Sequence, residues 1–354
     1  MPANNLPAPA VRAPRLQVLV NGSTAPHPIM AEIVSNNHYA ADRFRVTLAL
    51  NGGPAAPWAN ATDLAVEIQL SLDAGATWTS LLQGKVDTVD LAPLAGTVRL
   101  FGRDRTADLI EALTRETFAN QTASDIALQL AARHNLAADV TPTTTLVGRY
   151  WQLEHDRTTL DQFSTATNEW DLLVALAQAE GYDVWIEAAT LYFHPVAQQA
   201  DAATVLRTVR TPDGPANVTD LRLERALALA QTIEVTVKSW NAREQTAFVQ
   251  TATNSPSASG NVAKRYVVVV PNLAPDAALK LAEQKLAALT RQELTLSADI
   301  PGELSLRPRM PLQLVGTNST FDQIYWIEEI VRRLDFQSGF TQRIRASSVS
   351  TTPL

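Results

Sequence analysis

Alternating apolar and polar positions dominate the N-terminal part of the chain. The pattern is clear in "RLQVLVNG", "DRFRVTLAL" (Asp42 to Leu50) and "DLAVEIQLSLD" (Asp63 to Asp73). Shorter segments of the same kind follow around "LLQGKVDTVDL" and "GTVRLFGRD", with Gly, Asn and Pro between them. A period of two is typical of half-buried strands, and Asn-Gly is a hairpin signal. The pattern predicts a small antiparallel barrel or sandwich.

Helical spacing replaces this alternation after residue 104. In "RTADLIEALTRETF", the apolar residues Leu109, Ile110, Leu113 and Phe118 lie at near-helical spacing, with Thr106 as the expected N-cap.

In "TASDIALQLAARHNL" we expect Thr122 to cap a second helix, with Asp125 at the capping-box position. Its inward-facing residues are expected to be Ile126, Ala127 and Leu130.

A third helix is predicted in "NEWDLLVALAQAEG", ending at Gly181, followed by the hairpin "YDVWIEAATLYFHP". After it the β pattern returns, with "EVTVKSW" as a strong strand and one amphipathic helix beginning at Pro275. Pro301-Gly302 is expected at a turn.

We therefore predict a mainly β protein with three domains. They are an N-terminal arm and first β-barrel (1–103), an α/β insert (104–204), and a second, similar barrel (205–354) with a loop and helix inserted at about 253–292.

Composition narrows the functional classes. A chain of 354 residues suggests two or three domains, and its formal charge of -7 argues against a protein that holds nucleic acid by its phosphates. Cysteine is absent, which excludes disulfide scaffolds and cysteine-ligated metals. We expect no signal peptide and no membrane insertion, because no segment has the necessary long apolar run. The Pro/Ala-rich start is expected to be a flexible arm that orders on assembly.

The most suggestive chemistry is the triplet Glu154, His155 and Asp156 in "YWQLEHDRTTL". In an extended segment, adjacent side chains point to opposite faces, so Glu154 and His155 would not converge on one site. We interpret Asp156 or Thr158 as the cap of a helix containing Leu160 to Phe163. The adjacent pair Glu328 and Glu329 could be the two carboxylates of a glycosidase. Because neighbours in a strand face opposite ways, we interpret this pair as structural.

The other polar and aromatic candidates also favour structural roles. No His-x-x-x-His spacing, nucleophile elbow or phosphate-binding loop occurs. The remaining histidines are separated along the chain: His27, His38, His134 and His194. The chain has seven tryptophans, which could stack on sugars or bases, but core packing is expected for most of them. The seven are Trp58, Trp78, Trp151, Trp170, Trp185, Trp240 and Trp326. We predict no catalytic, cofactor-binding or metal-binding residue, and no enzyme.

The order of segments resembles the baseplate hub of contractile phage tails, the late control gene D protein family. It is also similar to the head region of type VI secretion spike proteins. The resemblance rests on "GKVDTVDL…GTVRLFGRDRTADLI", on "TFANQTASDIALQLAARHNL", which is LysM-like, and on "DQFSTATNEWDLLVALAQAEGYDVWIEAATLYFHP". "IEVTVKSWN" and "ADIPGELSLRPRMPLQLVG…YWIEEIVRRLDFQSGFTQRIRA" resemble the closing barrel. Arg309 stands where that family has a glycine, so a differently built turn is expected after Pro308.

The resemblance implies a structural baseplate hub in the virion tail, assembled in the host cytoplasm. It implies a homotrimer whose two barrels per chain form a pseudo-sixfold ring. That ring would join a hexameric tail tube or tube-initiator protein to a trimeric central spike, beside the baseplate wedge proteins. DNA and the tape measure protein would pass through it, and an acidic lumen would let DNA pass unbound.

Two alternatives remain. One is a peptidoglycan-binding or cell-wall-degrading tail protein, suggested by the LysM-like insert and by aromatic residues. The other is the hub of a tailocin or contractile injection system, which needs the same ring.

Overall fold

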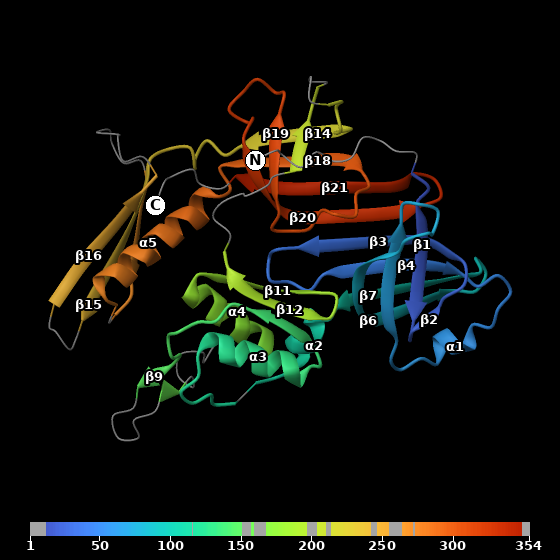
Figure 1. Ribbon diagram of the computed structural model, residues 1–354, viewed down its shortest axis with the longest axis horizontal. Helices are drawn as coiled ribbons and strands as arrows, with labels where there is room; N and C mark the ends of the chain where they lie inside the picture. The colour runs from blue at the N-terminus through green and yellow to red at the C-terminus, as the bar shows by residue number, and fades with distance from the viewer. Residues whose placement is uncertain are drawn as a thin grey trace.

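The computed structural model describes residues 12–114, 116–150, 157–158, 168–196, 204–209, 214–241, 246–254, 264–271 and 273–348. Most of the described strands belong to one large sheet that combines both ends of the chain (Figure 1). Its strands are, in spatial order, β14 (Asp220–Arg225), β18 (Leu294–Pro301), β21 (Gly339–Ser348), β20 (Ile324–Asp335), β3 (Pro28–Asn36), β4 (Arg43–Ala49), β7 (Thr97–Asp104), β6 (Thr79–Ala92), β5 (Ala65–Ser71), β1 (Arg15–Val20) and β2 (Ser23–Thr24). A short parallel pair extends it, β13 (Thr204–Arg207) with β19 (Pro311–Val315), which pairs in turn with β20.

The pairing of β3 with β20 joins the two β regions. These strands run antiparallel, with Val34 opposite Val331 and Met30 opposite Asp335. On each side of this joint, alternate residues point into a separate apolar cluster. In β4, Phe44, Val46 and Leu48 are buried while the residues between them are not. In β18 the buried positions likewise alternate along the strand. The predicted alternation therefore builds two cores behind one continuous sheet.

The central part of the chain forms the predicted α/β module below the large sheet in Figure 1. Its helices are α2 (Thr106–Glu111), α3 (Ala123–Arg133) and α4 (Glu169–Glu180). They pack on a three-stranded sheet of β11 (Tyr182–Glu187), β12 (Thr190–Pro195) and β8 (Ala137–Val140). The short helix α1 (Ala56–Ala59) lies outside this module, between β4 and β5.

Two of the predicted helix ends are confirmed. Thr122 and Asp125 form a reciprocal capping box at the start of α3, with the Asp125 backbone N–H donating to Thr122 Oγ1 at 3.2 Å. Gly181 ends α4 in the left-handed conformation with φ 73°, which favours glycine. The inward positions predicted for α3 are also buried.

The first helix of the module differs from the prediction. It ends at Glu111, because Ala112 is extended and Leu113 pairs in an isolated bridge with Asn168. Leu113 is consequently 78% exposed, whereas Phe118 is buried. Arg105, not Thr106, occupies the N-cap position, and Thr106 is the first helical residue. A tertiary contact thus overrides the helical period of the local sequence.

A second small sheet lies at the left of Figure 1, composed of β16 (Thr246–Thr253), β15 (Ile233–Asn241) and β17 (Lys264–Val269). Helix α5 (Pro275–Thr290) packs on one of its faces and begins at Pro275, as predicted. These strands pair with one another instead of joining the large sheet. The mainly antiparallel β fold is confirmed, while the domain boundaries stay predictions.

Among the described residues, none of the helices combines the length and apolar character needed to span a bilayer.

Candidate functional site

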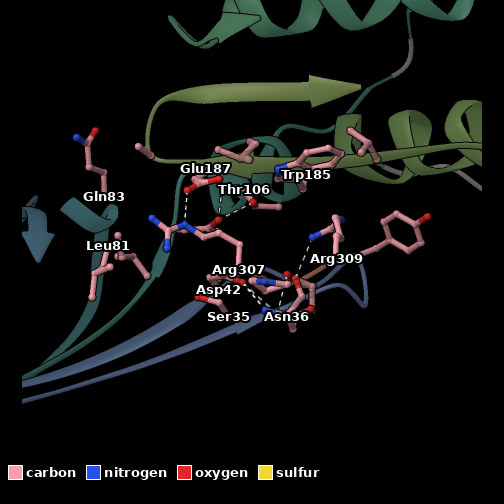
Figure 2. Close-up of a pocket in the computed structure, with 18 of the residues that line it drawn as sticks. Ser35, Asn36, Asp42, Leu81, Gln83, Thr106, Trp185, Glu187, Arg307 and Arg309 are labelled. Atoms are coloured by element: carbon pink, nitrogen blue, oxygen red, sulfur yellow. Dashed lines mark hydrogen bonds and ion pairs between the residues drawn. The ribbon is translucent and has the colours of Figure 1, made fainter. Parts of the chain in front are cut away.

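Three segments that are distant in sequence meet around a small cavity of about 60 Å³, shown in Figure 2. They are the turn after β3, the hairpin β11–β12, and the loop between β18 and β19. The cavity therefore lies where the α/β module meets both halves of the large sheet. We call it the junction cavity.

Arg309 is the main connection between these segments. Its Nε donates to Asp183 Oδ2 at 2.6 Å and its Nη1 donates to the carbonyl oxygen of Asn36 at 3.3 Å. Its guanidinium also lies over the Trp185 ring, 4.9 Å from the ring centroid. Arg309 holds φ at 75°, a left-handed conformation that is costly for a residue with a Cβ. The expected unusual turn after Pro308 is thus an arginine in a backbone region that favours glycine, stabilised by side-chain contacts on two other segments.

A second arginine of the same loop repeats this arrangement. Arg307 Nε donates to Glu187 Oε1 at 2.5 Å, and Figure 2 shows the two side chains directed toward each other. Because the pair is partly exposed, it contributes less to stability than the Arg309 contacts. The loop begins at Gly302, where a Cβ would lie 2.1 Å from the Phe340 ring. The predicted Pro301-Gly302 turn therefore needs glycine for close approach.

Arg332 lies on β20 beneath the cavity and is 2% exposed. Its Nη2 donates to the carbonyl oxygen of Leu306, and its Nε has no hydrogen-bond partner among the described residues. Burial lowers the pKa of Arg332 to about 10, so the guanidinium remains charged at neutral pH.

Two carboxyl groups, Asp42 and Asp104, share the cavity with this cation. Asp42 Oδ1 accepts from the backbone N–H of Asn36 at 2.9 Å, and Asp104 accepts from Thr106 Oγ1 at 2.9 Å. Burial raises the pKa of Asp42 to about 6, against hydrogen bonds that lower it. Burial, followed by the nearby charge of Asp42, raises the pKa of Asp104 well above its ordinary value. Ionising both carboxyls is therefore unfavourable in the folded chain.

The turn after β3 is also tied to helix α4. Trp170 Nε1 donates to the carbonyl oxygen of Tyr39 at 2.7 Å. Burial, together with the charge of Asp183, raises the pKa of Tyr39 to about 12. These contacts use the polar groups of the turn to position the module against the sheet.

The side-chain contacts around the junction cavity hold segments of the chain together. Most of the charged groups that line the cavity have internal partners, and among its described lining residues no Ser, Thr or Cys nucleophile is paired with a His base. Within the described ranges, no cluster of three or more His, Cys, Asp or Glu residues could hold a metal ion.

The predicted candidates are not brought together by the fold. Glu154, His155, Asp156 and the segment Leu160 to Phe163 lie outside the described residues. Thr158 is in strand β10 (Arg157–Thr158), paired with β9 (Arg149–Tyr150). An extended backbone is compatible with an N-cap, and residues 159–167 lie outside the described residues, so Thr158 as a helix cap stays a prediction.

Glu328 of the acidic pair and two of the histidines have local partners. Glu328 is buried and accepts from Ser347 Oγ at 2.6 Å and from Gln292 Nε2 at 2.7 Å. A β-bulge lies between Ile327 and Glu329.

His134 contacts the buried Glu169 at 2.5 Å, and His194 contacts Thr141 Oγ1 at 2.7 Å. These contacts hold the α/β module together.

The tryptophan prediction is partly confirmed. Trp170 and Trp326 are buried, but Trp78 is 39% exposed and Trp240 is 51% exposed. Trp151 lies outside the described residues. Sequence reasoning missed the junction residues Asp42, Asp104, Asp183 and Arg332, since nothing in their local sequence indicates that they meet. Arg309 alone had a signal, because it stands at a position of a turn that favours glycine.

Comparisons with known proteins define the class first. The fold is shared with proteins described as phage tail proteins and with a type VI secretion component. A tail protein from Neisseria meningitidis MC58 is 17% identical, with a TM-score of 0.70 over 95% of this chain and 96% of the other. The 43 kDa tail protein of prophage MuSo2 from Shewanella oneidensis is 14% identical, with a TM-score of 0.66 over 94% and 98%. The c3393 protein of E. coli, a component of the type VI secretion system, is 11% identical, with a TM-score of 0.57 over 94% and 77%.

The family follows from the sequence. The model of the Alg8 N-terminal domain family matches residues 96–301, which is more than half of the chain, and the chain belongs to this family. No curated protein matches the sequence.

Proposed function

We propose that this chain is a structural hub of a phage tail baseplate, similar to the late control gene D proteins. In this proposal it forms a homotrimer whose ring joins a hexameric tail tube or tube-initiator protein to a trimeric central spike. The wedge proteins surround the ring, and DNA and the tape measure protein pass through it. Its place is the virion tail, after assembly in the host cytoplasm.

The observation that carries this proposal is the pairing of β3 with β20. A ring of three chains can present six alternating positions only if each chain holds two β regions at a fixed spacing. Backbone hydrogen bonds between β3 and β20 fix the two regions relative to one another. The fold likeness to tail proteins over nearly the whole chain supports the same function.

The experiment is a native-mass measurement by light scattering on the purified chain, alone and co-expressed with the adjacent spike gene. We expect a trimer, and end-on electron microscopy should show six lobes. The lumen of that ring is expected to be acidic, and a basic lumen would contradict the passage of DNA proposed for it. A chain that stays monomeric with or without the spike, and that degrades peptidoglycan in a zymogram, would contradict the hub proposal. It would support the alternative of a cell-wall-degrading tail protein. The same ring in a particle without a genome would indicate an injection system.

A further inference from the structure

Among the described residues, the sheet of β15, β16 and β17 is covered on one face only. On that face, side chains of β15 pack against helix α5: Ile233, Val235 and Val237 against Ala278, Ala282 and Leu286. Helix α5 also faces the rest of the molecule, since a Cβ on Gly181 would lie 2.9 Å from Gln284 Nε2. In Figure 1, α5 accordingly lies between the small sheet and the α/β module, and the other face of the sheet is directed outward.

This outward face carries a cluster of apolar side chains. Its members are Trp240 (51% exposed), Val249 (55%), Val267 (56%) and Val269 (72%). The strand register places them on one face: Lys238 of β15 lies on this face between Val249 and Val269, and Thr236 lies beside Val267. Single exposed valines are common on protein surfaces, but a group of them on one sheet face marks a contact surface.

The edges of the same sheet are also open. Among the described strands, β16 and β17 each pair only with β15. Strand β17 belongs to "KRYVVVVP", an apolar run with high β-propensity. An unpaired edge of this kind is an aggregation hazard that proteins normally cover or blunt. The described part of the chain therefore leaves both an apolar face and an apolar edge of this sheet uncovered.

Charge indicates what covers them. Residues 233–290, from β15 to the end of α5, contain six Lys and Arg and four Asp and Glu, a formal charge of +2. The whole chain has a formal charge of -7, so the remaining residues carry -9. The unit that bears the open face is thus opposite in sign to the rest of the same chain. Such opposite charges steer the unit of one copy toward the acidic body of another.

We propose that the outward face formed by Trp240, Val249, Val267 and Val269 binds a second copy of this chain, on the acidic body outside residues 233–290. The contact joins two different surfaces, and repeated contacts of this kind close a ring. The inference rests on the proposed homotrimer and specifies which surface forms it.

The experiment uses the absence of cysteine from the chain. Val249→Cys places one thiol in the centre of the proposed contact, and Leu128→Cys on α3, where Leu128 is 47% exposed, is the matched control. Each variant is treated with a fluorescent maleimide as the assembled oligomer and after dilution to monomer. We expect the thiol of Val249→Cys to react about tenfold or more slowly in the oligomer, because a neighbouring copy covers it. The thiol of Leu128→Cys should react at the same rate in both states.

A second arm measures native mass. The double variant Val249→Lys/Val267→Lys should be a monomer at concentrations where the original chain is a trimer, with an unchanged circular dichroism spectrum. A double variant that remains a trimer, or a thiol equally reactive in both states, would overturn this surface and leave the hub intact. A chain that is monomeric alone but trimeric with the spike is labelled in that complex. A Val249→Cys thiol that reacts there as fast as in the monomer would keep the hub and overturn the copy contact. A chain that is monomeric under both conditions would refute the hub and the copy contact together.

Discussion

The junction cavity and the outward face of the β15–β17 sheet are opposites. At the junction, charged side chains are withdrawn from water and pair with groups from other segments, such as Arg309 with Asp183. On the outward face, apolar side chains such as Val269 are left in water. The paired charges at the junction lose hydration free energy when they are buried, so they stabilise the chain only while every partner is present. The outward face contributes little to folding and can become favourable when another molecule covers it. The difference separates surfaces that hold one chain together from surfaces that bring chains together.

The largest expected loss of stability comes from removing the Arg309 contacts at the junction. Arg309→Ala removes the contacts to Asp183, Asn36 and Trp185 but keeps a Cβ at φ 75°. We expect a loss of about 2–4 kcal/mol in the free energy of unfolding, measured by urea denaturation with tryptophan fluorescence.

Two control variants test the cause. Arg309→Gly should lose about 1 kcal/mol less than the alanine variant, because glycine tolerates the left-handed conformation. Arg99→Ala, which removes an exposed ion pair with Asp90, should change stability by less than about 0.5 kcal/mol. Equal losses for Arg309→Ala and Arg99→Ala would show that the junction does not hold the module.

The next effect depends on pH. Burial raises the pKa of Asp42 from its ordinary 3.8 to about 6, and that of Asp104 in the same direction. The folded chain therefore binds more protons than the unfolded chain between these values, and stability falls as pH rises from about 4 through about 6. Asp104→Asn should raise the free energy of unfolding at pH 8 and change it little at pH 4, because the amide removes the need to ionise a buried carboxyl. A variant that is less stable than the original chain at pH 8 would contradict this account.

A smaller effect should stay within the α/β module. Asn168 caps helix α4, its Oδ1 accepting from the backbone N–H of Asp171 at 2.7 Å. Asn168→Ala should cost about 1 kcal/mol, and Asn168→Asp, which keeps an acceptor, much less. Hydrogen exchange should increase in α4 while the amides of β18 and β21 keep their protection. Increased exchange throughout the large sheet would mean that the module and the sheet unfold as one unit.

The smallest effect on folding is expected on the outward face. Val249→Lys should change the free energy of unfolding of the monomer by less than about 0.5 kcal/mol, because the Val249 side chain is 55% exposed and does not pack in a core. Thermal unfolding of dilute protein measures this, with Leu128→Lys as the comparison. A large loss for Val249→Lys alone would place this face among the folding surfaces and remove its contrast with the junction.

Local sequence signals were reliable where short-range interactions dominate. The Thr122 capping box, the Gly181 terminus and the Pro275 start appear where their residue types predict them, since each is satisfied within one helical turn. The prediction was wrong at Leu113, where an isolated bridge to Asn168 ends the helix early. It was also wrong at Trp240, where an apolar side chain in a strand pattern lies on an uncovered face. Neither outcome has a signal in the neighbouring residues.

The sequence by itself determined that this chain is mainly β, that Thr122 caps α3 and Gly181 ends α4, and that the chain contains no cysteine chemistry. Periodicity and capping act over a few residues, so they can be read directly from the chain. The tertiary structure decided that β3 pairs with β20 and that Arg309 reaches Asp183, 126 positions away in sequence. It also decided which face of β15 receives α5. These outcomes depend on the distances between segments after folding, which local residue patterns do not encode.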